Sequence, residues 1–344
     1  MTNPCHGIHE IGIGVPDLAA ALRHWHAFGF RLAARGTLDR AQARALYGVD
    51  SALESWRLAH GTADKGLLRL MCWERPTGPG LAMTPLRTAG NRWTVQMTDD
   101  LLPVWTHAEV ARRLGRPISV LGPVLNARAA IPLAQQRPFE VAVPATYNLQ
   151  LFQPLCQQVV MQRMHIDARR LGTIDVGSLL RTSEVCHVGL VAYNLPLATF
   201  DFYEHALGLV RSTQRRFAYD PESPASEMFA LVPGEAFTEI DFDDPRSRSD
   251  PPASLAGRLR VFLVESPSPR PAAVDACAGV LGYGLYSLRC ADPDTLRATV
   301  AAAGATAVTP LLADEFDEPA FCFRSPDGYH WTASRVSPAS GPPP

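Results

Sequence analysis

The stretch Cys186–Val210, CHVGLVAYNLPLATFDFYEHALGLV, decides the fold. Residues Val188–Val191 predict a strand that begins beside His187, and Tyr193–Pro196 carries the asparagine and proline of a turn. Apolar residues then recur at helical spacing, at Leu197, Phe200, Tyr203 and Leu207. Gly208 predicts the end of this helix, because glycine adopts the left-handed conformation of many helix C-termini. The pattern is therefore strand, turn, short helix and next strand.

The same order of elements recurs along the chain, with further copies starting at Ile8, Arg92 and Gly284. In the first copy, Ile8–Asp17 predicts a strand and a Pro-Asp turn, and Asp17 is a suitable N-cap for the next helix. Glu10 lies seven residues before Asp17, as His187 lies seven residues before Asn194. Repeats of one design are rarely accidental, so the chain is predicted to contain four related modules.

This pattern resembles the βαβββ module of the vicinal oxygen chelate superfamily, which includes glyoxalase I, extradiol dioxygenases and bleomycin- and fosfomycin-resistance proteins. The resemblance implies an α+β fold in which four modules pair into two cup-shaped half-barrel domains. We expect a glyoxalase-like N-terminal domain over 1–155 with a degenerate metal site. A polar, partly helical connector would follow over 156–184, a glyoxalase-like C-terminal domain over 185–336 and a disordered tail over 337–344.

Composition limits the class of protein. The chain has 344 residues, a net charge of −2 and 47% hydrophobic residues, which suit two globular domains and give no basic footprint for nucleic acid. We found no apolar run long enough for a membrane helix and no signal peptide. Seven cysteines without a Cys-x-x-Cys pair indicate reduced thiols. We therefore expect a cytoplasmic protein that binds a small molecule, with a homodimer as an open alternative.

The resemblance also implies metal-ligand positions, one on the first strand and one on the last strand of each module. In the third module we take MFALVP (228–233) and AFTEIDFDD (236–244) as the later strands, so the positions fall on His187 and Glu239. Imidazole and carboxylate both bind divalent ions such as Fe, Mn, Zn or Ni. A lone histidine or an outward-facing carboxylate is as often structural, and that alternative stays open.

The other ligand positions depart from the superfamily pattern. In the fourth module they hold Leu285 and Thr332. In the N-terminal half they fall on Glu10, Arg69, the neighbourhood of Arg92 and Trp93, and Gln150. An arginine repels a cation, so this cup is predicted to have lost its metal. His6 and His9 lie shortly before Glu10, and one of them would replace it as the ligand if the strand register shifted by one residue.

The remaining candidate site residues are aromatic, amide and cationic side chains on the predicted cup walls. Glu239 and Tyr286 are the candidate catalytic residues. The candidate substrate-binding residues are Trp93, Gln150, Arg289 and Trp331. Because strands that close a cup present every second side chain to its cavity, we expect an aromatic or carboxylate-bearing ligand. Pairing of the second and third modules, which the sequence does not decide, would place Gln150 beside His187 and Glu239.

Two functions stay open. The first is a superfamily enzyme, a lyase, isomerase or dioxygenase, with a divalent metal at a reduced site in the C-terminal cup. The second is a metal-free protein that binds or sequesters a small molecule, as the bleomycin-resistance proteins do. Motifs of nucleophilic or nucleotide-dependent catalysis, such as Gly-x-Ser-x-Gly, were not found.

Overall fold

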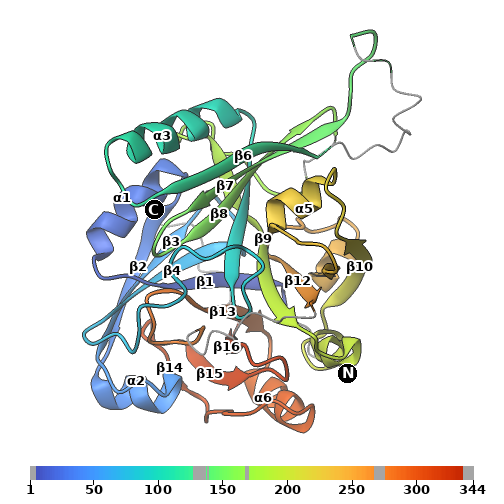
Figure 1. The fold of residues 1–344 in the computed structure, drawn as a ribbon. Coiled ribbons are helices and arrows are strands. Elements are labelled where there is room, and N and C mark those ends of the chain that lie inside the picture. Colours follow the sequence, from blue (N-terminus) through green and yellow to red (C-terminus); the bar gives the residue numbers. More distant parts are fainter. Residues whose placement is uncertain (1–4, 127–136, 138, 167–169, 267–275, 336–344) are drawn as a thin grey trace.

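The computed structural model describes residues 5–126, 137, 139–166, 170–266 and 276–335. The predicted disordered tail, 337–344, lies outside the described residues. Within them the chain forms two eight-stranded sheets with short helices around them (Figure 1). The predicted α+β architecture with a repeated module is confirmed.

Each module supplies four strands. The first contains β1 (Ile8–Gly14), α1 (Leu18–Ala27), β2 (Arg31–Leu38), α2 (Arg40–Tyr47), β3 (Leu53–Ala59) and β4 (Leu67–Trp73). The second contains β5 (Arg92–Thr98), α3 (Leu101–Arg113), β6 (Ser119–Asn126), β7 (Ala145–Phe152) and β8 (Gln157–Met164). The third contains β9 (Thr182–Tyr193), η2 (Leu197–Asp201), α4 (Phe202–His205), β10 (Val210–Ala218), α5 (Pro224–Phe229), β11 (Ala236–Asp243), η3 (Pro245–Arg248) and β12 (Arg258–Glu265). The fourth contains β13 (Gly282–Cys290), α6 (Pro293–Ala302), β14 (Leu312–Ala313), β15 (Pro319–Arg324) and β16 (His330–Arg335).

Strand order answers the question of module pairing. The first sheet runs β14-β15-β16-β13-β1-β4-β3-β2 and joins the first and fourth modules. The second sheet runs β10-β11-β12-β9-β5-β8-β7-β6 and joins the second and third modules. We call the concave faces of these sheets the first cup and the second cup. The ranges 1–155 and 185–336 therefore do not coincide with the two sheets, because each sheet takes strands from both.

Two local predictions need correction. The predicted connector contains β8, a strand in which Val159, Val160 and Met161 are buried among polar neighbours. The predicted strand MFALVP instead begins inside α5, which Ser223 caps by accepting a hydrogen bond from Ala225 N at 3.3 Å. The third module therefore closes with β12, a strand after the one that contains Glu239.

Helix boundaries follow the sequence signals. The Asp17 side chain accepts a hydrogen bond from Ala20 N at 2.9 Å and begins α1, as the sequence predicts. In the third module a 3₁₀ turn, η2, precedes α4, and Gly208 has a φ of 70° just after the helix. The residues between strand and helix thus adopt the predicted turn–helix form, with a tighter first turn.

The main hydrophobic core packs α1, α3, α4 and α6 against both sheets, with Trp25, Val104, Tyr203 and Leu296 as members from these helices. Smaller buried clusters lie in each cup. Figure 1 shows α2 and α6 beside the β14–β16 end of the first sheet, and α5 beside β9 of the second. A cavity forms in the second cup, with residues of α5 in its lining.

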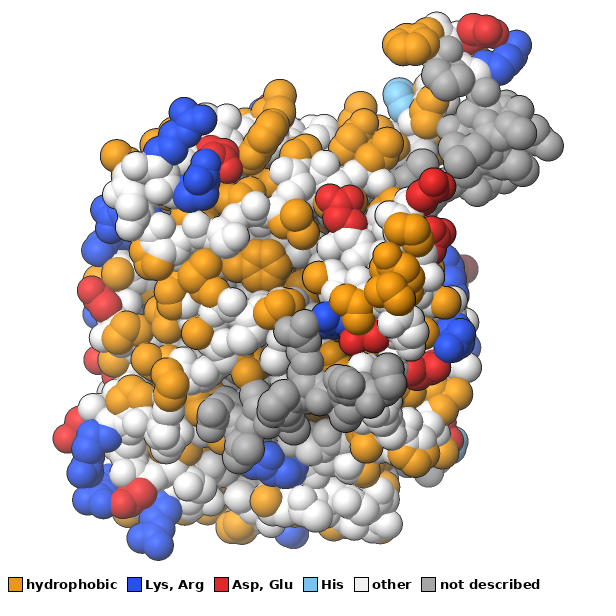
Figure 2. All heavy atoms as spheres, viewed as in Figure 1, with side chains coloured by type: hydrophobic (Ala, Val, Ile, Leu, Met, Phe, Trp, Pro, Cys, Tyr) orange, Lys and Arg blue, Asp and Glu red, His pale blue; other side chains and the backbone are white. Residues whose placement is uncertain are grey.

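The face of the molecule seen in Figure 2 carries mixed charge. On the face in Figure 2, acidic and basic side chains occur together among apolar and polar ones. Such mixed charge differs from the single-sign stripe of a nucleic-acid interface. No helix among the described residues is long and apolar enough to cross a membrane.

Candidate functional site

The second cup encloses a cavity of about 340 Å³, lined by strands of the second and third modules and by α5. This volume falls within the range of small-molecule sites, roughly 300–1,000 Å³. One part of the lining is aromatic and apolar, and the other is rich in arginine. A ligand here would meet two chemically different ends.

The apolar end is an aromatic floor. Trp93 of β5 lies 5.0 Å, centroid to centroid, from Phe262 of β12, and Phe229 of α5 lies 4.5 Å from the same ring. Phe237 of β11 packs 4.8 Å from Phe229. A Cβ atom at Gly189 would lie 2.1 Å from the Trp93 indole, so only glycine at this β9 position lets the indole lie against the strand. The floor thus depends on backbone as well as side chains.

The charged end is built by alternation along two paired strands. Arg258, Arg260 and Phe262, at every second position of β12, face the cavity. Arg260 donates to both Asp241 oxygens at 2.6 and 2.9 Å, and Arg258 Nη2 donates to Asp243 Oδ2 at 3.1 Å. Burial lowers the pKa of Arg260, but the Asp241 and Glu239 carboxylates outweigh it and hold that pKa well above its ordinary value. Both guanidinium groups are therefore fixed in orientation by carboxylates.

Arg215 of β10 is the exposed cation of the cavity lining. Within the described part of the chain it makes no hydrogen bond or ion pair, and in the strand register it lies opposite Glu239. Its neighbour Arg216 points away from the cavity and pairs with Glu265 at 2.8 Å. Arg215 is thus the cation that an incoming anion would meet first.

The predicted metal pair does share one cavity. His187 of β9 and Glu239 of β11 both belong to its lining. Arg260 Nη1, however, lies 3.5 Å from His187 Nε2 and 3.6 Å from Glu239 Oε2. A guanidinium so close to both groups would repel a divalent cation. No group of three or more His, Cys, Asp or Glu side chains suited to a metal occurs among the described residues. These residues do not fit a divalent metal.

The strand register explains why Arg260 lies beside His187. Arg69 on β4 lies opposite Gly12 of β1, and Arg260 on β12 lies opposite Gly189 of β9. Arg260 is therefore the counterpart of Arg69 on the last strand of its module. Glu239 belongs to the third strand, so its assignment to the last-strand position was wrong. Both cups carry arginine at the last-strand position, where the resemblance stated above implies a metal ligand.

Other predicted site residues are distributed differently from expectation. Trp93 lines the cavity, whereas Gln150 is buried and donates to Met228 O at 3.1 Å, which ties β7 to α5. Tyr286 and Trp331 belong to the core shared by the sheets, and Tyr286 donates to Gly189 O at 2.9 Å. Arg289 belongs to the first sheet and donates to Glu318 at 2.8 Å. Tyr286, Trp331 and Arg289 therefore do not line this cavity.

Sequence reasoning missed several residues of the cavity. They are Arg163, Arg215, Phe229, Phe237, Arg258, Arg260 and Phe262. The alternation Arg-x-Arg-x-Phe within Arg258–Phe262 was the available signal, because it places three side chains on one face of a strand.

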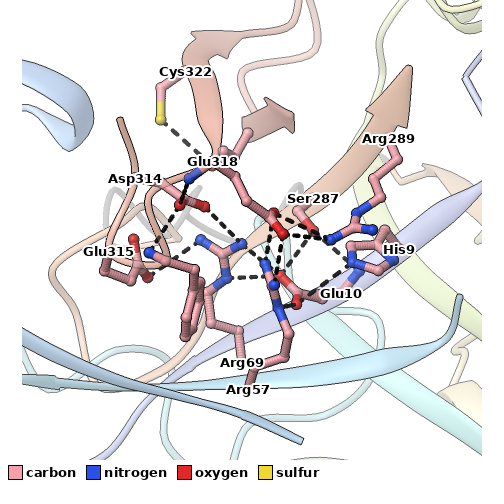
Figure 3. A network of polar contacts seen from close by, with 12 residues as sticks. His9, Glu10, Arg57, Arg69, Ser287, Arg289, Asp314, Glu315, Glu318 and Cys322 are labelled. Carbon is pink, nitrogen blue, oxygen red and sulfur yellow. Dashed lines mark hydrogen bonds and ion pairs between the residues drawn. The ribbon is translucent and has the colours of Figure 1, made fainter. Parts of the chain in front are cut away.

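The first cup is closed by its own side chains. Arg69 Nη2 lies 2.6 Å from Glu10 Oε2, and Arg57 also donates to Glu10 (Figure 3). The loop Asp314–Glu318 adds carboxylates, with Glu315 3.2 Å from Arg69. Burial raises the pKa of Glu10, but Arg57 and Arg69 hold it below its usual range. Glu10 is therefore an ionised partner for both arginines.

The loop Asp314–Glu318 also covers the first cup. Glu318 accepts from Arg57 at 2.9 Å and from Arg289 at 2.8 Å. The Phe316 ring lies 4.1 Å from the Arg57 guanidinium, in a cation–π arrangement. Figure 3 shows the arginines and carboxylates meeting in one network. An arginine at a ligand position that already binds Glu10 does not fit a metal site either.

Comparison with known proteins supports the architecture. No family model and no curated protein matches the sequence. A mutant of glyoxalase I from Zea mays is 14% identical, with 96% of this chain and 93% of that chain covered and a TM-score of 0.53. A proposed dioxygenase from Bacillus subtilis is 13% identical, with 98% and 87% covered and a TM-score of 0.57. The chain thus has the fold of the vicinal oxygen chelate superfamily, as the sequence predicts.

Proposed function

We propose that the second cup binds an aromatic small molecule that carries a carboxylate, and that it does so without a metal ion. The observation that carries this proposal is the pairing of an aromatic floor with Arg215, a cavity cation without a partner among the described residues. The ligand ring would stack on Trp93 and Phe262, where offset aromatic contacts are favourable. Its carboxylate would meet Arg215, since arginine binds carboxylates through two parallel hydrogen bonds.

The fixed arginines support the same ligand class. Arg258 and Arg260 are held by Asp243 and Asp241, so they need no rearrangement to present a positive edge to the cavity. Carboxylate groups behind them limit the net positive charge, which favours one carboxylate over a highly charged anion. In this proposal His187 provides a polar wall beside Arg260.

The test is calorimetric titration with benzoate, phenylacetate and indole-3-acetate, with benzyl alcohol as the neutral counterpart of benzoate. We expect the carboxylates to bind and the alcohol to bind at least tenfold more weakly. Arg215→Met should weaken carboxylate binding roughly tenfold, the order expected for a hydrogen bond to a charged group. Arg216→Met is the matched control, because this adjacent arginine faces away from the cavity, and it should leave the affinity unchanged.

The competing candidate is the metal-dependent enzyme, which would need a divalent ion between His187 and Glu239 in spite of the Arg260 guanidinium beside both. Metal analysis of the purified protein separates the two functions. A stoichiometric divalent ion that is lost in His187→Ala would support the enzyme with the metal. Equal losses of binding in Arg215→Met and Arg216→Met, or equal binding of benzyl alcohol and benzoate, would contradict the metal-free proposal.

A further inference from the structure

A second cavity, of about 310 Å³, lies where the loop between β3 and β4 meets the segment before β9 and the loop before β12. It shares no lining residue with the cavity of the second cup. Gly61, Thr62 and Thr173 are exposed at its edge, whereas His60, Lys65 and Glu184 are buried. The cavity therefore has an accessible rim and a polar floor.

Glu184 of β9 supplies a buried carboxylate to this floor. Its side chain is 4% exposed, and its Oε2 accepts a hydrogen bond from Thr173 N at 2.9 Å. Within the part of the chain that the structure describes, no lysine or arginine forms an ion pair with this carboxylate. Burial raises the pKa of Glu184, as expected of a carboxylate whose charge lacks a bonded cation. Such a group gains most from a cationic ligand.

His60 adds a second acceptor. Its Nε2 lies 3.0 Å from Thr182 O, and a carbonyl oxygen only accepts, so Nε2 carries the hydrogen. Burial lowers the pKa of His60, which keeps the imidazole neutral and leaves Nδ1 as a bare acceptor. This Nδ1 lies 3.8 Å from Glu184 Oε2. Two acceptors of the cavity floor thus lie close together.

The other charges of the lining also favour a cation. Lys65 is already engaged, because its Nζ lies 2.6 Å from Asp244 and 2.8 Å from Ser254 O. Asp64 and Asp175 add carboxylates nearer the rim, where Arg246 and Arg31 contact them from outside the lining. A metal ion is disfavoured, since no group of three metal-binding side chains is found in the described ranges. An organic cation with several N–H donors suits the acceptors better.

We propose that this cavity is a binding site for a small organic ammonium ion, a protonated primary amine, with Glu184 as its counter-ion and His60 Nδ1 as a second acceptor. An ammonium group has three N–H donors, which would engage Glu184 and His60 together. The cavity volume of about 310 Å³ leaves room for a short alkyl or aryl group on the amine. The proposal does not depend on the second cup.

The test is calorimetric titration of the full chain with butylammonium, with n-butanol and butyrate as neutral and anionic probes of the same size. We expect saturable binding of butylammonium alone. Glu184→Gln should weaken it roughly tenfold or more, because it removes the charge and keeps an acceptor for Thr173 N. Glu222→Gln, at an exposed carboxylate outside both cavities, is the matched control and should not change the affinity.

A melting temperature measured on the same samples shows whether Glu184→Gln is folded. If it is not, Ala63→Phe tests the site by filling the cavity with an aromatic side chain, and it should abolish butylammonium binding. Absence of saturable butylammonium binding to the wild type would overturn the proposal. So would equal affinities in Glu184→Gln and Glu222→Gln, unimpaired binding to folded Ala63→Phe, or equally tight binding of n-butanol.

Discussion

In the first cup Arg69 contacts Glu10, Asp314 and Glu315, whereas in the second cup its counterpart Arg260 contacts Asp241 and borders an open cavity. The strands that carry the two arginines have the same order and register. What differs is the connection between strands, because the loop Asp314–Glu318 brings carboxylates into the first cup. The comparison teaches that the sheet sets where a cup lies, while its loops decide whether a ligand can enter.

The largest expected effect concerns the buried charges of the first cup. Glu10→Ala should lower the free energy of unfolding by about 3–5 kcal/mol, because it leaves Arg57 and Arg69 buried without their shared partner. Denaturant unfolding measures this loss. Glu54→Ala, at an exposed carboxylate on β3 of the same sheet, should cost less than about 0.5 kcal/mol. Equal losses in the two variants would show that the network does not stabilise the first cup.

Acid should destabilise the first sheet through His9 of β1. Burial lowers the pKa of His9 to about 4, against about 6.5 in an unfolded chain. The unfolded state therefore binds a proton that the folded state does not, and stability falls as the pH drops from about 6.5 to about 4. Relative to His9→Asn, the wild type should lose roughly 3 kcal/mol over this window.

Denaturant unfolding at a series of pH values measures this difference. Asparagine keeps a donor for Asp64 O, which His9 contacts at 2.8 Å. His107→Gln, at an exposed histidine on α3, should retain the wild-type slope. Identical slopes for wild type and His9→Asn would contradict a neutral buried His9.

The aromatic floor of the second cup can be disturbed through its backbone. Gly189→Ala places a methyl group where the Trp93 indole lies, so the ring must move. We expect a loss of roughly 1–3 kcal/mol in unfolding free energy, the usual cost of overpacking. The affinity for benzoate should also fall. Gly177→Ala, at an exposed glycine whose Cβ position meets only the Asp175 side chain at 3.3 Å, separates local packing from a general glycine effect. Unchanged stability and binding in Gly189→Ala would refute the stacked floor.

The smallest expected effect tests the loop that covers the first cup. Phe316→Ala removes the ring beside Arg57 and should cost about 1 kcal/mol of unfolding free energy, the order of a partly desolvated cation–π contact. It should not create benzoate binding in an Arg215→Met background, since Glu10 and Glu318 still engage the arginines. Benzoate binding by the double variant would show that the Phe316 ring alone keeps benzoate out of the first cup.

Much of the fold was predictable because the signals were local. The seven-residue spacing from Glu10 to Asp17 and from His187 to Asn194 recurs in the structure as strand, turn and helix. The pairing of modules was not predictable, because any first strand could align beside any other. The prediction of a polar connector was wrong at β8. The polar residues Gln157 and Gln158 begin this strand, and its buried apolar residues follow them.

The candidate site was predicted in part. His187, Glu239 and Trp93 line one cavity, because β9, β11 and β5 belong to the same curved sheet. The metal assignment depended on counting strands in the third module. The segment 228–233 was counted as a strand although it begins in α5, so the last-strand position was assigned to Glu239 on β11 instead of Arg260 on β12. Arg215 could not be singled out from Arg216 by sequence, because only the strand register decides which of two adjacent arginines faces the cavity.

The nested pairing of modules also bears on the order of synthesis. In the second sheet the two modules meet at pairs such as Thr98 and Thr182, 84 residues apart, and its last strand in the chain ends at Glu265. The first sheet needs contacts such as Glu10 with Ser287, 277 residues apart. During synthesis β1 therefore leaves the ribosome long before β13, the strand that pairs with it, has been made. Until then one edge of β1 is unpaired and can form hydrogen bonds with strands of other chains. The first sheet thus begins with the first strand of the chain and is completed only by the last. A chain interrupted after Glu265 would have all strands of the second sheet, while β1 of the first sheet would keep one unpaired edge.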